Sequence, residues 1–232
     1  MKPKLTFGNQ VLIKLDKAND TIKLKNGVEL YLDTTFEVEK HATVTGEICG
    51  LPKKLKYTGR ANDGMPWNTP MELKIGDRVV IYYMAVINAL APERMRAMAV
   101  EGDNYIWTGY QNVYAAVRDG QIVPVNGYCL IEPCENPEWV EIMERMAKLN
   151  LRGIPPNTKS LTGVVYGKVK YLGRPNIAYV DGHTDDQVAI NVGDTVVMKK
   201  ISDIPLEYDL HAKIDGGRKY WRVQRRNILA KL

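Results

Sequence analysis

The stretch INVGDTVVMKK at residues 190–200 decides the fold, because a close copy of it, LKIGDRVVIYY, occupies residues 73–83. Both stretches run from an apolar residue through Gly-Asp and one polar residue into three apolar residues. Gly76 and Gly193 permit the positive φ of a sharp turn, and the aspartate after each can accept backbone N–H bonds there. The β-branched residues that follow are typical of a strand. Each stretch therefore predicts a tight turn that leads into a strand.

Three further blocks recur in the same order around these turns, whose glycines lie 117 residues apart. The matched pairs are NQVLIKL (9–15) with NGYCLIEP (126–133), VTGEICGLP (44–52) with VYGKVKYLG (165–173), and YIWTGYQNVYAAV (105–117) with YWRVQRRNILAKL (220–232). A conserved order of matched blocks indicates an internal repeat. The sequence therefore predicts two domains, residues 1–121 and residues 122–232, which join at RDGQIVPVNG.

The matched blocks predict an all-β fold. Val11, Ile13 and Leu15 alternate with Leu12 and Lys14, which is the period of a strand. Short runs of this kind, separated by Gly, Asn and Pro, favour a small and mostly antiparallel barrel in each copy. Side chains would fill the interior of such a barrel and leave no ligand cavity.

Long insertions separate the matched blocks, and the one in the second copy predicts a short helix. Asn136 suits the N-cap, Pro137 the first helical position and Glu138 the first turn, while Gly153 lies beyond the end. An apolar stripe runs along the predicted helix. Its members are Trp139, Ile142, Met143, Met146, Ala147 and Leu149.

Composition excludes several classes of protein. The chain is 45% apolar and 25% charged with a net charge of +5, which is typical of a globular protein. No apolar run is long enough for a membrane helix and the N-terminus lacks a signal core, so we expect a cytoplasmic protein. Cysteines and histidines lack metal-ligand or disulfide spacing, so no metal site is expected. They are Cys49, Cys129, Cys134, His41, His183 and His211.

No enzyme is expected from this sequence, and no cofactor. The chain has no G-x-G-x-x-G dinucleotide motif, and no spacing suggests a nucleophile beside a base. Asp185 and Asp186 form a carboxylate pair, but their setting predicts a turn.

With the four blocks in place, the chain resembles the co-chaperonin (GroES-like) family. The elements that carry the resemblance are VLIKLD, TVTGEI, KIGDRVVIYY and NVYAAV in the first copy, and CLIEP, VVYGKV, NVGDTVVMKK and RNILAKL in the second. The tandem arrangement is similar to the double-headed co-chaperonins of plastids, and phages also encode divergent members. The resemblance implies two GroES-like barrels in a homo-oligomeric ring that caps or modulates a chaperonin ring and assists protein folding.

The resemblance also implies a docking loop after the first strand, and Gly27–Leu32 is its nearest match here. We expect Gly27, Val28, Glu29, Leu30, Tyr31 and Leu32 to contact the chaperonin. The segment departs from the family at Glu29, because an unpaired carboxylate opposes burial. An alternating edge strand is the alternative for these residues.

The second copy lacks this loop motif and offers its helix and the residues after it. Its candidate contacts are Trp139, Met143, Met146, Leu151 and Ile154. Two alternatives stand for this helix: an amphipathic partner-binding role, and a surface helix that packs on its own barrel, which the sequence favours.

Two rival functions remain open at this point. A basic and aromatic cluster near the C-terminus suits a single-stranded nucleic acid. It contains Arg218, Lys219, Tyr220, Trp221, Arg222, Arg225 and Arg226. Alternation along a strand separates these side chains onto two faces, so nucleic-acid binding is not expected. The second rival is a ring-forming structural or phage-assembly protein that keeps the GroES-like fold without docking on a chaperonin.

Overall fold

The computed structural model shows a mainly β chain with two short helices in the part that it describes. It describes residues 5–6, 8–17, 21–23, 26–31, 42–57, 65–91, 96–150, 163–185, 188–202, 204–206 and 218–232. The predicted all-β class is confirmed. We call residues 5–124 the first half, residues 128–232 the second half, and residues 125–127 the joining turn.

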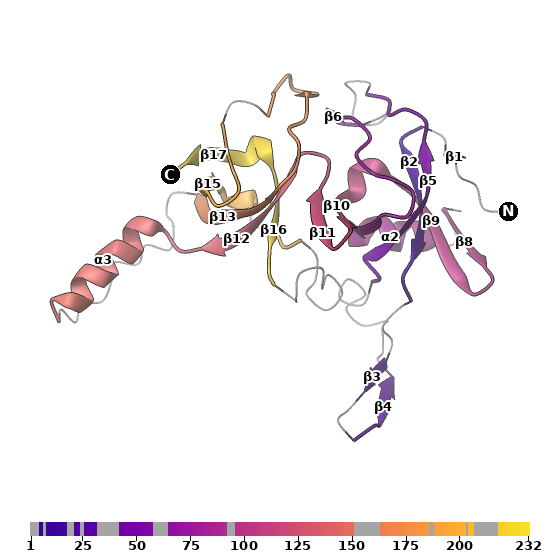
Figure 1. Cartoon of the computed structure of the whole chain (residues 1–232), viewed down its shortest axis with the longest axis horizontal. Coiled ribbons are helices and arrows are strands. Elements are labelled where there is room, and N and C mark those ends of the chain that lie inside the picture. The colour runs from indigo at the N-terminus through magenta and orange to yellow at the C-terminus, as the bar shows by residue number, and fades with distance from the viewer. Residues whose placement is uncertain are drawn as a thin grey trace.

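The first half is built on an eight-stranded sheet (Figure 1). Its elements are β1 (Leu5–Thr6), β2 (Gln10–Leu15), β5 (Thr45–Pro52), β7 (Arg78–Ile81), α2 (Tyr83–Leu90), β8 (Ala97–Val100), β9 (Asp103–Gly109), the 3-10 turn η2 (Tyr110–Asn112), β10 (Val113–Arg118) and β11 (Gln121–Pro124). The strand order is β11-β10-β7-β5-β2-β9-β8, and β1 pairs with β5 in parallel.

The second half is built on a five-stranded antiparallel sheet of order β16-β12-β13-β15-β17. Its elements are β12 (Tyr128–Cys134), α3 (Pro137–Lys148), β13 (Val164–Leu172), β14 (Ala178–Tyr179), β15 (Thr195–Lys199), the 3-10 turns η3 (Lys200–Ser202) and η4 (Arg225–Asn227), β16 (Trp221–Gln224) and β17 (Ile228–Lys231). Two small ribbons complete the chain. They are β3 (Thr21–Lys23) with β4 (Glu29–Tyr31), and β6 (Trp67–Asn68) with β14.

Five neighbouring strands occur in the same order in the two sheets. The order β9-β2-β5-β7-β10 in the first half corresponds to β16-β12-β13-β15-β17 in the second. The irregularities correspond too. The ladder of β2 and β5 shifts register between Leu12 and Ile13, and that of β12 and β13 shifts between Leu130 and Ile131. The repeated sequence blocks thus produce the same pairing twice. The predicted boundary at residues 121 and 122 falls at the start of β11, which pairs with β10.

The two Gly-Asp turns have the predicted conformation. Gly76 and Gly193 have φ values of +87° and +96°, which favour glycine because it has no Cβ. Asp77 Oδ2 accepts a hydrogen bond from the Lys74 amide at 2.8 Å, and Asp194 Oδ2 accepts one from the Asn191 amide at 2.7 Å. The turn prediction is confirmed in both halves.

The inner face of each sheet carries its own apolar core. Ile13, Ile48 and Ile106 are fully buried in the first half, and Ile131 and Val169 are fully buried in the second. Neither sheet closes on itself within the described residues. The closed barrels expected from the sequence therefore stay a prediction. No helix in the described part of the chain is both long enough and apolar enough to cross a membrane.

Candidate interaction surfaces

The predicted docking segment lies in a small hairpin that extends away from both sheets (Figure 1). β3 and β4 pair only with each other among the described strands, with Leu30 opposite Ile22 in the ladder. Gly27 has a φ of +83°, and the Val28 amide donates to Asn26 Oδ1 at 3.2 Å. β4 is thus neither an edge strand of the large sheet nor an irregular loop.

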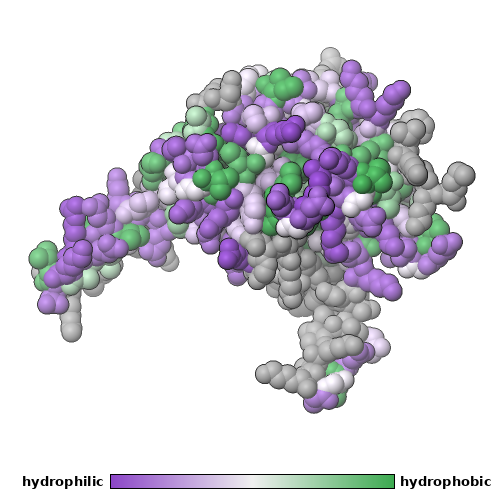
Figure 2. All heavy atoms as spheres, in the orientation of Figure 1, coloured by the Kyte–Doolittle hydropathy of each residue, from purple (hydrophilic) through white to green (hydrophobic). Residues whose placement is uncertain are grey.

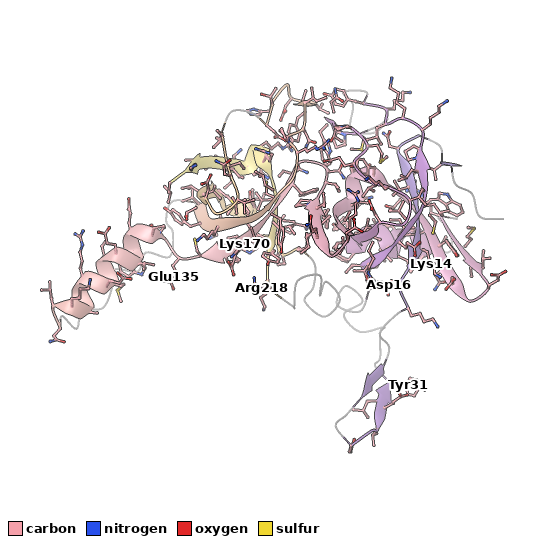
Figure 3. All side chains as sticks on the ribbon, viewed as in Figure 1. Lys14, Asp16, Tyr31, Glu135, Lys170 and Arg218 are labelled. Carbon is pink, nitrogen blue, oxygen red and sulfur yellow. The ribbon has the colours of Figure 1, made fainter. Side chains whose placement is uncertain are left out.

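The hairpin exposes most of its predicted contact residues. Val28 and Leu30 are 48% and 47% exposed, and Tyr31 is 81% exposed and points away from the body in Figure 3. Successive side chains of a strand face opposite sides, so Leu30 lies on one face and Glu29 and Tyr31 lie on the other. Leu30 can therefore be buried against a partner without burying the Glu29 carboxylate. Leu32 lies outside the described residues.

Helix α3 also extends away from the body, and none of its residues is buried (Figure 1). Its predicted start is confirmed: Asn136 Oδ1 accepts from the Glu138 amide at 3.1 Å, and Pro137 begins the helix. Positive φ at Asn150 follows its last turn. The described residues therefore contradict the alternative in which this helix packs on its own sheet.

One side of α3 is apolar. Trp139, Ile142, Met143 and Met146 follow the i, i+3, i+4, i+7 spacing that places side chains on one helix face. Ile142 is 46% exposed and Met143 is 38% exposed. Green apolar atoms lie among purple polar ones on both the hairpin and the helix in Figure 2. The other two predicted contacts, Leu151 and Ile154, lie outside the described residues.

The hairpin and the helix leave the fold at equivalent places. The hairpin lies between β2 and β5, and α3 lies between β12 and β13, which occupy the same positions in the two sheets. Figure 3 shows Asp16 where the chain leaves the first sheet and Glu135 at the start of α3. The repeat thus presents two different apolar elements, one from each half.

The sequence did not point to the joining turn as a centre of polar contacts. Asn126 is completely buried, and its Nδ2 donates to the carbonyls of Tyr110 and Val113, both at 2.8 Å. Its own carbonyl accepts from Asn176 Nδ2 and Gln224 Nε2, both at 3.0 Å. This residue connects the two halves. In the sequence, the pair Asn126-Gly127 indicates a turn. It does not show which groups the Asn126 side chain contacts.

Three arginines of the basic and aromatic cluster contact other residues of the same chain. The Arg222 guanidinium lies 4.2 Å from the centre of the Tyr114 ring, and that of Arg226 lies 4.4 Å from the centre of the Tyr179 ring. Arg225 Nη1 donates to the Gly173 carbonyl at 3.0 Å. Arg222 thus contacts the first half, and Arg225 and Arg226 contact loops and strands of their own half. These contacts favour a structural role over a nucleic-acid surface.

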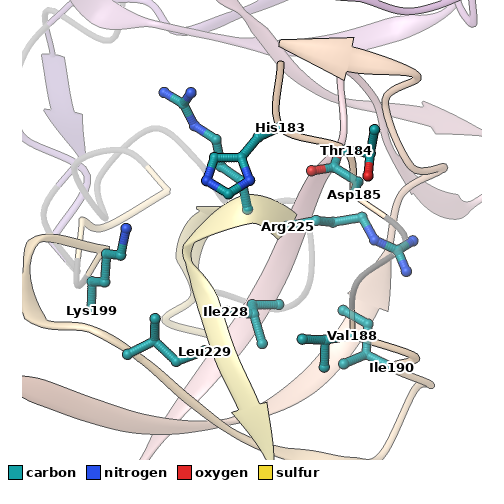
Figure 4. Close-up of a pocket in the computed structure, with 10 residues that line it drawn as sticks. His183, Thr184, Asp185, Val188, Ile190, Lys199, Arg225, Ile228 and Leu229 are labelled. Carbon is teal, nitrogen blue, oxygen red and sulfur yellow. The ribbon is translucent and has the colours of Figure 1, made fainter. Parts of the chain in front are cut away.

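A cavity of about 190 Å³ lies in the second half, beside this cluster (Figure 4). Asp185 lines it and is 5% exposed; it accepts from the Asn176 amide at 2.8 Å and from the Tyr179 hydroxyl at 3.1 Å. Burial raises the pKa of this carboxyl above its usual value. Asp185 lies in a turn, as the sequence predicted, and its carboxylate is buried there. Asp186 lies outside the described residues. None of the predicted contact residues lines the cavity.

The cysteines differ in their surroundings, and no disulfide joins them. Cys129 is buried, Cys49 is half-buried and Cys134 is exposed. Among the described residues no three His, Cys, Asp or Glu side chains gather into a metal-binding group. The hairpin and helix α3 thus expose apolar side chains on elements that extend from the body. No protein-family model and no curated protein matches this chain.

Proposed function

We propose that this protein is a co-chaperonin, which forms a ring of GroES-like barrels and caps or modulates a chaperonin through the hairpin and α3. One observation carries the proposal: both apolar elements leave the repeated sheet at the same position and expose their apolar side chains. This is the position at which the resembled family has its docking loop.

The hairpin suits weak and reversible binding. Burying a complete aliphatic side chain contributes about 1.5–3 kcal/mol, and Leu30 and Val28 are each half-exposed. A two-stranded hairpin is marginally stable by itself, so part of that gain is lost in ordering it against a partner. Several copies in one assembly raise the overall affinity through their effective concentration. Weak single contacts then still permit release.

Helix α3 offers a second contact of a different kind. An amphipathic helix binds by placing its apolar face in a groove, and Trp139, Met143 and Met146 form such a face. Methionine adapts to irregular apolar surfaces because its side chain is unbranched and flexible. The opposite face holds an ion pair between Glu141 and Arg145, four residues apart, and remains in water. The two elements together allow one chain to make two unlike contacts.

The test is retention of the purified full-length protein by an immobilised chaperonin ring in the presence of nucleotide. We expect the wild type to be retained and Leu30→Asp to be lost, because the aspartate would be buried unpaired. Glu29→Gln should be retained, since Glu29 faces the opposite side of the strand. Ile75→Asp is the matched control, because Ile75 is 53% exposed but lies at the first Gly-Asp turn.

Failure of the wild type to bind would contradict the proposal and favour the structural or phage-assembly alternative. Equal retention of wild type and Leu30→Asp would contradict the role of the hairpin. In that case Met143→Asp tests whether α3 alone makes the contact.

A further inference from the structure

The cavity beside Asp185 is formed by several segments of the second half (Figure 4). Its walls come from the turn after β14 (residues 183–185), from Val188 and Ile190, from Lys199 at the end of β15, and from η4 and β17. Its volume of about 190 Å³ is larger than that of one water, which occupies about 30 Å³ of the liquid. Pockets for drug-sized ligands are larger, at roughly 300–1,000 Å³. The cavity therefore suits a small ion or molecule.

The lining changes from buried and apolar to exposed and polar. Ile190 and Ile228 are buried, whereas His183 and Lys199 are exposed. In Figure 4, His183 and Lys199 lie on one side of the cavity and Ile190 lies on the other. A solute can enter from the exposed side. Apolar side chains at the other side reduce the screening of a charge inside the cavity, so electrostatic interactions there are stronger than on an open surface.

The charges of the lining favour an anion. Lys199, Arg225 and Arg226 line the cavity together with one carboxylate, that of Asp185. Arg226 Nη1 also pairs with Asp181 Oδ2 at 3.2 Å. Within the described part of the chain, Lys199 forms no ion pair. Three cationic groups against two carboxylates leave an excess of positive charge at this place.

Two buried polar atoms of the lining have no hydrogen-bond partner among the described residues. They are Asp185 Oδ1, which is an acceptor, and Arg225 Nε, which is a donor. Asp185 Oδ2 is already bonded to the Asn176 amide and the Tyr179 hydroxyl. Buried polar groups nearly always have a partner. A ligand that satisfies both atoms must donate one hydrogen bond and accept another.

We propose that this cavity binds inorganic hydrogen phosphate. The P–O–H group of the ion would donate to Asp185 Oδ1, and its unprotonated oxygens would accept from Arg225 Nε and from the Lys199 ammonium. Guanidinium and ammonium groups are common ligands of phosphate, and a hydrogen bond to a carboxylate is among the strong ones.

The buried carboxylate also makes the site selective. Sulfate has the shape of phosphate but carries no proton in neutral water, so it would place an anionic oxygen against Asp185. At about pH 8 inorganic phosphate is mainly HPO₄²⁻ and keeps one proton, whereas a phosphate monoester, with a second pKa of about 6, has lost its last one. Only the inorganic ion among these three can then donate to Asp185.

Titration calorimetry of the full-length protein with sodium phosphate tests the proposal, with sodium sulfate and O-phosphoserine as the comparison probes. Burial raises the pKa of Asp185, and the charges of Arg225 and Arg226 oppose that rise. We would therefore work at about pH 8, where the carboxylate form is favoured over the acid. Phosphate should bind at least about 100-fold more tightly than either probe, because a site built to bond a hydroxyl rejects an analogue that lacks it. No binding of phosphate, or equal affinity for phosphate and sulfate, would overturn the proposal.

Asp185→Asn tests the selectivity. The amide oxygen can still accept from Asn176 and Tyr179, and the amide N–H₂ then lies where the carboxylate accepts. An N–H group donates to either oxyanion, so the variant should bind sulfate about as tightly as phosphate. A variant that retains the preference of the wild type for phosphate would contradict the assigned role of Asp185.

Lys199→Gln tests the charge at the exposed side. It should weaken the binding of phosphate by about five-fold, the upper range for an exposed charge pair. Lys200→Gln is the matched control, because Lys200 is an exposed neighbour that does not line the cavity, and it should keep the affinity of the wild type. Equal affinities of these two variants would contradict the placement of the ion.

Phosphate binding does not depend on docking to a chaperonin, because neither the hairpin nor α3 lines the cavity. Leu30→Asp should therefore bind phosphate like the wild type. A failure of docking and a failure of phosphate binding are thus distinguishable in the same set of variants.

Discussion

The two halves share one order of five strands, but the first half covers its last strand and the second leaves it open. β10 lies between β7 and β11, whereas β17 pairs with β15 alone among the described strands. β10 is covered because the chain that follows it folds back as β11 and pairs with it. The apolar core thus imposes the strand order, while the segment next in the chain decides whether an edge is covered.

The hairpin and helix α3 also differ between the halves although the strand order is shared. The first half extends a two-stranded hairpin between β2 and β5, and the second half extends a twelve-residue helix between β12 and β13. Both leave the core at equivalent ends of paired strands. The sheet therefore tolerates either element, because neither contributes to the core of its half.

The first prediction, with the largest expected effect, removes the side chain that joins the two halves. Asn126→Gly keeps the positive φ but removes the Nδ2 donor from the buried carbonyls of Tyr110 and Val113, and the Tyr110 carbonyl still accepts from the Val113 amide. Leaving a buried carbonyl unsatisfied costs about 1–3 kcal/mol, so the free energy of unfolding should fall by at least about that amount in urea denaturation. Gly8→Asn is the matched change at the equivalent residue of the first half. It has open space and the same φ, so it should change stability little; equal losses for the two variants would contradict the comparison.

The second prediction concerns a glycine that both sheets place against the preceding strand. A Cβ on Gly46 would lie 2.7 Å from Ile13 Cγ2 and would also meet the Lys14 carbonyl, and one on Gly167 would meet Ile131 Cγ2 and lie 3.0 Å from the Glu132 carbonyl. Gly46→Ala and Gly167→Ala should each lower the free energy of unfolding by about 1–3 kcal/mol through overpacking. Similar losses would support equal packing in the two halves, and a loss at only one site would show that the halves differ there.

The third and smallest effect is a pH dependence that arises at a buried carboxyl of the second half. Burial raises the pKa of Asp185 in the folded state, so the ionised carboxylate is disfavoured there. Its contribution to stability is therefore present at low pH and is lost as the pH rises from the unfolded-state pKa through the raised folded-state value. Asp185→Asn does not ionise, so its melting temperature should improve relative to that of the wild type as the pH rises above about 4, the usual pKa of an aspartate, by no more than about 4 °C. A difference that does not change with pH would contradict the assignment.

The strands and the turns were predictable from the sequence because they depend on local rules. Alternating apolar residues set the inner face of β2 and β12, and Gly76 and Gly193 permit the turns before β7 and β15. The helix start at Asn136 depends on a side chain that bonds to an amide two residues away. Such signals need no knowledge of distant segments.

The contacts between the halves were not predictable in the same way. Arg222 in the sequence resembles a residue of a nucleic-acid surface, yet it packs on Tyr114, a residue of the other half. The partner of Arg222 comes from a segment whose position is set by the whole fold.

By itself the sequence determined that the chain is mainly β, that it repeats, and that two unlike insertions interrupt the repeat, because periodicity and turn chemistry operate over a few residues. Only the tertiary structure decided that Asn126 joins the halves, that the hairpin and α3 extend from the body, and that β17 has an open edge. Those features depend on which surfaces meet after the chain folds, and residues far apart in the sequence determine them together.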